Sequence, residues 1–301
     1  MKLILANNQS EQFVAFHKEV QPAEQLYEYA GYASLLFYFD ASTCTFTNLD
    51  SGKAASNYDG VYLNGYLRTP EIAFSAATVL AHNNVPFVNS ELRDAPSLTK
   101  LSSYAKLAAA GVSVPKTYAA AATGLIRAAK AGKLADITFP CILKRADADR
   151  GIDNYILHDW AAVEEKLGQG EDDYIWLVQE FIPNDGYYVA TYYHDELEFG
   201  VYRAHMERTD NDETKRHMFK PKGGANATFL APADVPANVA EESHKAARAM
   251  KREIASVDVV CDTETDQPYV LEVNYNPQLV TVSVFRDERI ESFLNGIKSI
   301  E

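Results

Sequence analysis

Cysteine is scarce in this sequence, and its scarcity argues against two classes of site. The 301 residues include three cysteines, Cys44, Cys141 and Cys261, which are odd in number and far apart. A disulfide framework needs paired cysteines, and a zinc site needs cysteines or histidines at close spacing. Neither is indicated. Cys141 and Cys261 stand in apolar, strand-like runs and are predicted to be core residues.

Long apolar runs and positive charge are also lacking. No run approaches membrane-spanning length, and the apolar run at Leu3 is too short for a secretory signal. Lys and Arg number 28 against 42 Asp and Glu, a formal net charge of −14. Broad binding to nucleic acid or anionic membrane needs clustered positive charge, so we expect neither partner, although a local basic pocket fits this balance. We expect a cytoplasmic protein.

What is present is an ordinary globular composition, with 47% hydrophobic and 23% charged residues, long enough for two or three domains. Through about residue 90, strand-like runs alternate with helical patterns, which predicts a parallel α/β sheet. The predicted strands are residues 3–5, 35–39, 59–63 and 86–88. A helix is predicted over 97–111, and a domain boundary follows near residue 115.

The remaining chain divides into two α+β parts. From 116 to 183 the pattern predicts a strand ending at Lys144, a polar loop over 145–154, and further strands at 155–157 and 174–183. From 184 to 301 it predicts strands, a helix over 236–253 and a C-terminal hairpin. The predicted domains are therefore 1–115, 116–183 and 184–301.

The C-terminal hairpin carries three candidate metal ligands. Residues 256–260 and 269–276 are two β-branched runs joined by a polar turn, with Asp258 in the first and Glu272 and Asn274 in the second. Residues two apart on a strand share a face, so Glu272 and Asn274 should point the same way, and Asp258 can join them. Oxygen ligands of this kind suit Mg²⁺ held against phosphates. The alternative is an acidic hairpin whose carboxylates are solvated or merely paired.

Two lysines and a basic segment add candidates for phosphate binding. Lys100 opens the helix over 97–111, Lys144 ends a strand, and residues 215–224 form the one dense basic segment. Lysines neutralise phosphate oxygens, a metal ion bridges them, and a polar loop excludes water. Taken singly, each lysine also fits a solvated surface residue, and the basic segment fits a surface loop.

Taken together, these groups resemble the ATP-grasp superfamily, most closely its RimK-like carboxylate–amine ligases, over about residues 89–279. The resemblance rests on the order and spacing of short motifs, each weak alone. These motifs are residues 99–101, 110–117, 139–144, 178–182, 222–225, 257–259 and 271–277. It implies an ATP-grasp fold of α/β and α+β parts, preceded by a Rossmann-like pre-ATP-grasp domain.

The resemblance also implies residue roles. Lys100 and Lys144 would contact ATP phosphates, and the loop with Arg150 and Gly151 would close over them. The stretch at the end of the third strand of the middle domain would bind adenine. Asp258, Glu272 and Asn274 would hold Mg²⁺, with Mn²⁺ as an alternative. The adenine-binding stretch consists of Gln179, Glu180, Phe181 and Ile182.

The sequence departs from the family pattern in two places. The phosphate-covering loop keeps one glycine, Gly151, where the ligases carry more. The Asp-x-Arg pair expected after the hinge is absent, since residues 186–190 read Gly-Tyr-Tyr-Val-Ala. Arg203, Arg216, Lys220 or Lys222 would then bind the substrate carboxylate or the transferred phosphoryl group. Arg203 and Lys222 are the catalytic candidates.

The implied reaction is ATP-dependent ligation of a carboxylate to an amine through an acyl phosphate, with small-molecule or peptide substrates. Two alternatives stay open: a non-catalytic ATP-binding scaffold or regulator, and an ATP-grasp kinase that phosphorylates a hydroxyl. The resemblance also allows a homo-oligomer.

Overall fold

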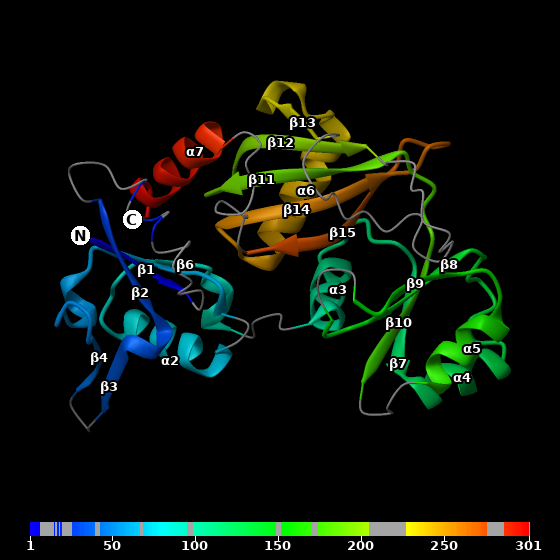
Figure 1. The fold of residues 1–301 in the computed structure, drawn as a ribbon, viewed down its shortest axis with the longest axis horizontal. Helices are drawn as coiled ribbons and strands as arrows, with labels where there is room; N and C mark the ends of the chain where they lie inside the picture. The colour runs from blue at the N-terminus through cyan, green and yellow to red at the C-terminus, as the bar shows by residue number, and fades with distance from the viewer. Residues whose placement is uncertain are drawn as a thin grey trace.

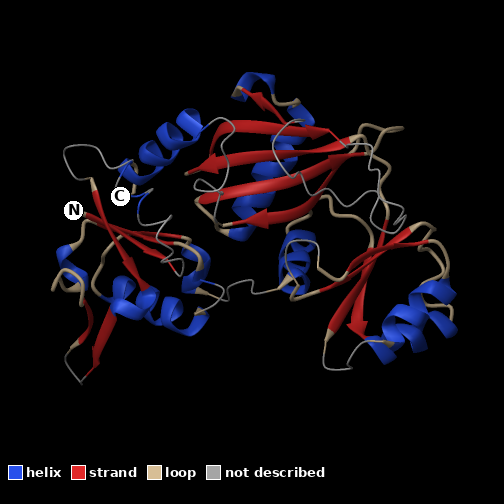
Figure 2. Ribbon diagram, viewed as in Figure 1, coloured by secondary structure: helices blue, strands red, loops and turns tan. Residues whose placement is uncertain are grey.

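The computed structural model describes residues 1–6, 15, 17, 19, 26–39, 43–66, 69–94, 99–148, 152–169, 174–204, 227–275 and 286–300. In this part of the chain, three sheets of four, four and five strands follow one another in sequence, and a two-stranded hairpin accompanies the first (Figure 1). Figure 2 shows each sheet with helices against it. The predicted mixture of α/β and α+β parts is confirmed.

The first sheet is parallel, as predicted. Its strands lie in the order β2-β1-β5-β6. Buried leucine and valine side chains from β1 and β5 pack against the alanine-rich face of helix α2. The elements are β1 (Lys2–Ala6), β2 (Tyr27–Gly31), β5 (Gly60–Leu63), β6 (Phe87–Val88) and α2 (Pro70–His82).

The strand predicted over residues 35–39 is real, but its expected place in the parallel sheet is wrong. It is β3 (Leu35–Phe39), and among the described strands it pairs with β4 (Cys44–Asn48) alone, in an antiparallel hairpin. Leu36 and Tyr38 on its outer side are 57% and 56% exposed. The edge position in the sheet belongs to β2, which sequence reasoning missed. Glu28, Ala30 and Gly31 of β2 are poor strand formers, so strand propensity alone favoured β3.

The middle sheet is antiparallel, in the order β7-β10-β8-β9. Helices α4 and α5 pack on one face of it and share its core. Asp159 caps the start of α5 by accepting the Ala162 N–H at 2.8 Å. The elements are β7 (Thr117–Ala121), α4 (Ala122–Lys130), β8 (Cys141–Arg145), β9 (Asn154–Leu157), α5 (Trp160–Gly168) and β10 (Ile175–Glu180).

The last sheet contains the predicted C-terminal hairpin. Its order is β13-β12-β11-β14-β15, all antiparallel, and α6 covers one face. Helix α3 (Lys100–Ala109) adds Leu107 to the same core. The other elements are β11 (Gly186–Tyr193), β12 (Glu196–Ala204), β13 (Ala227–Leu230), α6 (Ala237–Met250), β14 (Ile254–Cys261) and β15 (Pro268–Asn274).

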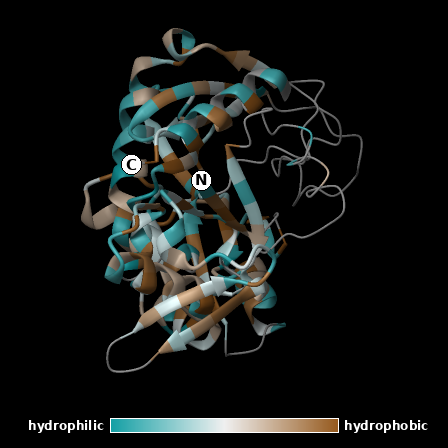
Figure 3. Cartoon of the chain, turned by 90° about the vertical axis from the view of Figure 1, so that its left-hand side faces the viewer, coloured by the Kyte–Doolittle hydropathy of each residue, from teal (hydrophilic) through white to brown (hydrophobic). Residues whose placement is uncertain are grey.

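The C-terminal helix returns to the first sheet. Phe293 and Ile297 of α7 (Arg286–Lys298) pack with Ile4 and Tyr62 in one core cluster, so both chain ends lie on the same side of the molecule (Figure 1). Hydrophobic and hydrophilic residues alternate along many helices and strands in Figure 3, as expected of elements with one buried face. No helix in the described ranges is both long and apolar enough to cross a membrane.

The contact of α7 with β11 depends on Gly296. A Cβ atom there would stand 2.0 Å from Cδ1 of Tyr193. We predict that Gly296→Ala lowers the free energy of unfolding by about 1–3 kcal/mol, because the buried ring must shift. Urea denaturation measures this change. The control is Gly168→Ala in α5, where nothing lies within 4 Å of the added atom. Equal stability of the two variants would contradict the prediction.

Candidate functional site

The three predicted metal ligands lie on one face of the last sheet. Asp258 on β14 lies directly opposite Glu272 on β15, and Ser256 lies opposite Asn274. Opposite residues of an antiparallel pair share a face, so Asp258, Glu272 and Asn274 come together on the side away from α6. Within the described ranges no three His, Cys, Asp or Glu side chains gather as a metal-binding group. A cation here would therefore be held by two carboxylates and one amide.

A β-bulge at Leu271 aims Glu272 at this face. The pairing shifts between Asp258 and Val259, which lie opposite Glu272 and Val270, so Leu271 has no opposite residue. Val270 is fully buried in the core under α6. In an unbroken strand Glu272, two residues later, would face the same way. The extra residue reverses the alternation and turns the carboxylate to the other face.

Arg203 and Tyr187 continue this polar face across the sheet. They lie opposite each other on β12 and β11, and β11 is the neighbour of β14 in the sheet. Burial and the charge of Glu272 raise the pKa of Asp258 to about 8, and Arg203 acts in the opposite direction. Burial and the charge of Asp258 raise the pKa of Tyr187 to about 12. The two carboxylates lie close together with one guanidinium group nearby. A divalent cation bound between them would reduce the repulsion between their negative charges.

Lys144 is a buried cation on the side of the middle sheet that faces the last sheet. It is 6% exposed. Its Nζ donates to Oη of Tyr104 at 3.0 Å and to Oε1 of Gln179 at 2.9 Å. In the part of the chain that the structure describes, no carboxylate lies within ion-pair distance of it. A buried charge without a counter-ion is unfavourable, so binding of an anionic ligand to this ammonium group would be favourable.

Gln179, predicted to bind the cofactor, holds Lys144 instead of pointing to open space. Its amide is 2% exposed, and its Nε2 donates to Oγ1 of Thr117 at 2.7 Å. Both ends of the amide are thus engaged within the middle sheet, with the oxygen on Lys144. Any contribution of this side chain to cofactor binding would act through the lysine.

Lys100 ties α3 to the start of the polar loop. Its backbone N–H donates to the Ala146 carbonyl at 2.9 Å, and its Nζ donates to the Ala148 carbonyl. Arg145 pairs at 2.8 Å with both Asp147 and Asp153, near the two ends of the loop. The base of the loop is therefore fixed by salt bridges.

The predicted adenine-binding stretch leaves β10 beside residue 116. The Glu180 N–H donates to the Lys116 carbonyl at 2.9 Å, and Oε1 of Glu180 accepts the Lys116 N–H at 2.7 Å. The Ile182 carbonyl accepts from Nδ2 of Asn184 at 2.7 Å. Phe181, between them, is half-buried. An adenine ring bound here would have to form hydrogen bonds with backbone groups of this stretch other than the Glu180 N–H and the Ile182 carbonyl.

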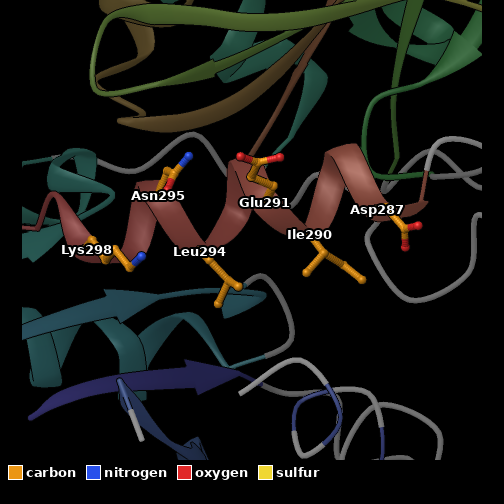
Figure 4. Close-up of a pocket in the computed structure, with 6 residues that line it drawn as sticks. All are labelled: Asp287, Ile290, Glu291, Leu294, Asn295 and Lys298. Carbon is orange, nitrogen blue, oxygen red and sulfur yellow. The ribbon is translucent and has the colours of Figure 1, made fainter. Parts of the chain in front are cut away.

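A separate cavity of about 330 Å³ lies along α7, lined by Asp287, Ile290, Glu291, Leu294, Asn295 and Lys298 (Figure 4). None of the predicted site residues lines it.

The chain was compared with known protein sequences and with solved structures. No protein-family model and no curated protein sequence matches the chain. A RimK-domain ATP-grasp protein from Sphaerobacter thermophilus is 19% identical, with a TM-score of 0.60 over 98% of this chain and 97% of that one. The ATP-grasp ligase PsnB with its minimal precursor is 14% identical, with a TM-score of 0.67 over 100% and 99%.

D-alanine–D-alanine ligase from Bacillus anthracis is 14% identical, with a TM-score of 0.63 over 100% and 97% of the two chains. The chain has the ATP-grasp fold. This agrees with the sequence-based resemblance, and the match extends through the first sheet.

Several predicted residues of this chain lie outside the described ranges: Arg150, Gly151, Arg216, Lys220 and Lys222. Two described residues were missed. Tyr104 lies one helical turn after Lys100 on α3, and that i, i+4 spacing was the available signal. Tyr187 lies in the stretch where the Asp-x-Arg pair was expected.

The raised pKa of Asp258 predicts a pH-dependent stability. The carboxyl pKa is about 8 in the folded protein against 3.8 ordinarily, so the folded state holds a proton that the unfolded state loses between these values. This contribution is complete below about pH 4 and is lost as the pH rises to 8. We predict that Asp258→Asn raises the metal-free stability at pH 8 by about 1–3 kcal/mol. Urea unfolding at pH 5.5 and 8 measures the difference.

The matched control is Asp262 in the turn of the same hairpin. The Thr265 and Glu264 N–H groups hold the pKa of its carboxyl below the ordinary value, so its effect has the opposite sign. Asp262→Asn should give no gain at pH 8. A gain from Asp262→Asn equal to that from Asp258→Asn would contradict the assignment.

Proposed function

We propose that this protein is an ATP- and Mg²⁺-dependent ligase that joins a carboxylate to an amine. The observation that carries the proposal is the separation of charge between two sheets. The middle sheet presents the ammonium group of Lys144 without a carboxylate partner among the described residues. The last sheet presents Asp258 and Glu272 as a crowded acidic pair. A polyphosphate with a bound divalent cation satisfies both.

The donor set fits magnesium. Carboxylate and amide oxygens from Asp258, Glu272 and Asn274 are hard ligands of the kind that Mg²⁺ accepts together with phosphate oxygens. When bound, the ion would neutralise charge on the transferring phosphoryl group. The solved ATP-grasp structures support this choice, since they include PsnB in complex with Mg and ADP and the B. anthracis ligase in complex with ATP.

The remaining residues would position the phosphates. Lys144 of the proposed domain 116–183 and Lys100 of the proposed domain 1–115 would bind them from the side of the middle sheet. Nε of Arg203 is buried and has no hydrogen-bond partner in the described part of the chain. Arg203 therefore retains a donor for a substrate carboxylate or a transferred phosphoryl group. Lys222 is proposed for the same task.

In the proposed reaction, a substrate carboxylate oxygen bonds to the γ-phosphorus as the bond to the β–γ bridging oxygen breaks and ADP leaves. The amine nitrogen then bonds to the acyl carbon, inorganic phosphate leaves, and the nitrogen gives up a proton. Positioning and electrostatics carry the first step, so no protein nucleophile is required. The names of the similar structures, which include a peptide-bound ligase, support small-molecule or peptide substrates.

Lys144→Met tests the nucleotide site. We expect it to weaken MgATP binding by roughly 10- to 100-fold, because a charge-assisted hydrogen bond contributes about 1.5–3 kcal/mol. Titration calorimetry gives the dissociation constant. The control is Lys130→Met on α4, a lysine that is 66% exposed and pairs with Glu164 at 3.8 Å. Equal affinity of both variants, or no MgATP binding by the wild type, would refute the proposal.

The reaction class needs a second measurement. A screen of amino acids and peptides should find pairs that release inorganic phosphate only when both the carboxylate and the amine are present. A stable phosphorylated product without phosphate release would indicate a kinase. Nucleotide binding without turnover across the screen would favour the scaffold alternative.

A further inference from the structure

We infer that Tyr104 is a positioning residue whose hydroxyl group couples the phosphate-binding lysine of the middle sheet to the metal-binding strand β15. This inference rests on the proposed function. Tyr104 belongs to α3 and is 7% exposed. Its Oη donates to the Leu271 carbonyl at 3.0 Å and accepts from Nζ of Lys144 at 3.0 Å. One hydroxyl group thus contacts both halves of the candidate site.

The direction of these hydrogen bonds is fixed. A hydroxyl group has one hydrogen to donate, and the Leu271 carbonyl can only accept it. Toward Lys144, which can only donate, the oxygen therefore presents a lone pair. Nζ also lies 4.8 Å from the centre of the Tyr104 ring, so the ammonium group is held by both the hydroxyl and the ring.

The Leu271 carbonyl receives this bond at the β-bulge. Leu271 has no opposite residue on β14, and the next residue along β15 is Glu272. The hydroxyl of Tyr104 therefore fixes the strand at the point where its alternation reverses. That point determines the direction of the Glu272 carboxylate.

The other end of the link determines the direction of Lys144. An ammonium group has three N–H bonds. Tyr104 and Gln179 take two of them, at 3.0 and 2.9 Å. Because the three bonds are tetrahedral, the two fixed partners determine where the third points. That third N–H is the one left for a phosphate oxygen.

The ring of Tyr104 is held firmly enough for this task. It packs with Ala146 and Leu177 of the middle sheet region, while Leu107 on the same helix belongs to the core under α6. Helix α3 is thus packed against both sheets, and the hydroxyl lies at their junction. Loss of the hydroxyl should leave this packing in place and release both polar contacts.

Tyr104→Phe tests the inference through the coupling between metal and nucleotide. We expect its MgATP affinity to fall roughly tenfold, and the factor by which Mg²⁺ strengthens ATP binding to shrink by a similar amount. Calorimetric titrations of ATP with and without Mg²⁺ give this factor. A merely structural role would lower the melting temperature without changing the factor.

The matched control is Tyr192→Phe, which removes a hydroxyl hydrogen-bonded to the Ala240 carbonyl at 2.8 Å and Oγ of Ser243 at 2.7 Å. It should lower stability to a similar extent and keep the magnesium factor of the wild type. In a Lys144→Met background, Tyr104→Phe should have much less further effect on ATP affinity.

The outcomes separate this inference from the proposed function. If wild type binds no MgATP, the proposed function fails. If wild type binds MgATP and Tyr104→Phe keeps the full magnesium factor, only the coupling role of Tyr104 is overturned. Additive effects of the Tyr104 and Lys144 substitutions would also overturn it.

Discussion

The buried ammonium group of Lys144 is the constraint on which the candidate site depends. Its removal from water is unfavourable unless hydrogen bonds and an anion compensate. The fold supplies the hydrogen bonds through Tyr104 and Gln179, from two other elements. The anion must come from a ligand or from a part of the chain outside the described ranges. The neighbouring residues therefore hold the charged ammonium group of Lys144 in a fixed orientation.

A second buried network holds the end of β15 in place. Arg252 and Glu91 are almost fully buried and pair at 2.6 Å, and Arg252 also donates to the Val273 carbonyl. Glu91 comes from the 3₁₀ turn that follows β6, so this pair joins the first sheet to the residue between Glu272 and Asn274. Buried ion pairs contribute little net stability against apolar substitutes, yet breaking one is strongly unfavourable. The network fixes geometry more than it adds stability.

Sequence reasoning reached those parts of the site that local pattern encodes. The two strands that carry Asp258, Glu272 and Asn274 were predicted because each is a short apolar run with a polar residue at a strand period. The bulge at Leu271 was not predicted, since alternation read from the sequence gives no sign of an extra residue. The hydrogen bonds of Lys144 were equally out of reach, because its partners lie 40 and 35 residues away along the chain.

The misplaced strand of the first sheet has a related cause. Strand propensity ranks β3 above β2, but a place in a sheet depends on which side chains the neighbouring elements can bury. Glu28 can occupy its position on β2 because Tyr58 donates a hydrogen bond to its carboxylate at 3.0 Å and Lys53 forms an ion pair with it. Those partners come from a different part of the chain. Local propensity cannot register a charge that a distant residue neutralises.

Charge is divided between the two sheets in a way that restricts what can bind between them. Tyr187 replaces the expected Asp-x-Arg pair and, with a pKa of about 12, stays neutral at physiological pH. Among the residues that the structure describes, Arg203 is the cation that acts on Asp258. This face repels a bare phosphate as long as both carboxylates are ionised. A metal ion alone satisfies the carboxylates and leaves Lys144 unpaired, whereas a phosphate alone does the reverse. A phosphate ligand that carries a divalent cation, such as the nucleotide proposed above, would neutralise both faces in one binding event.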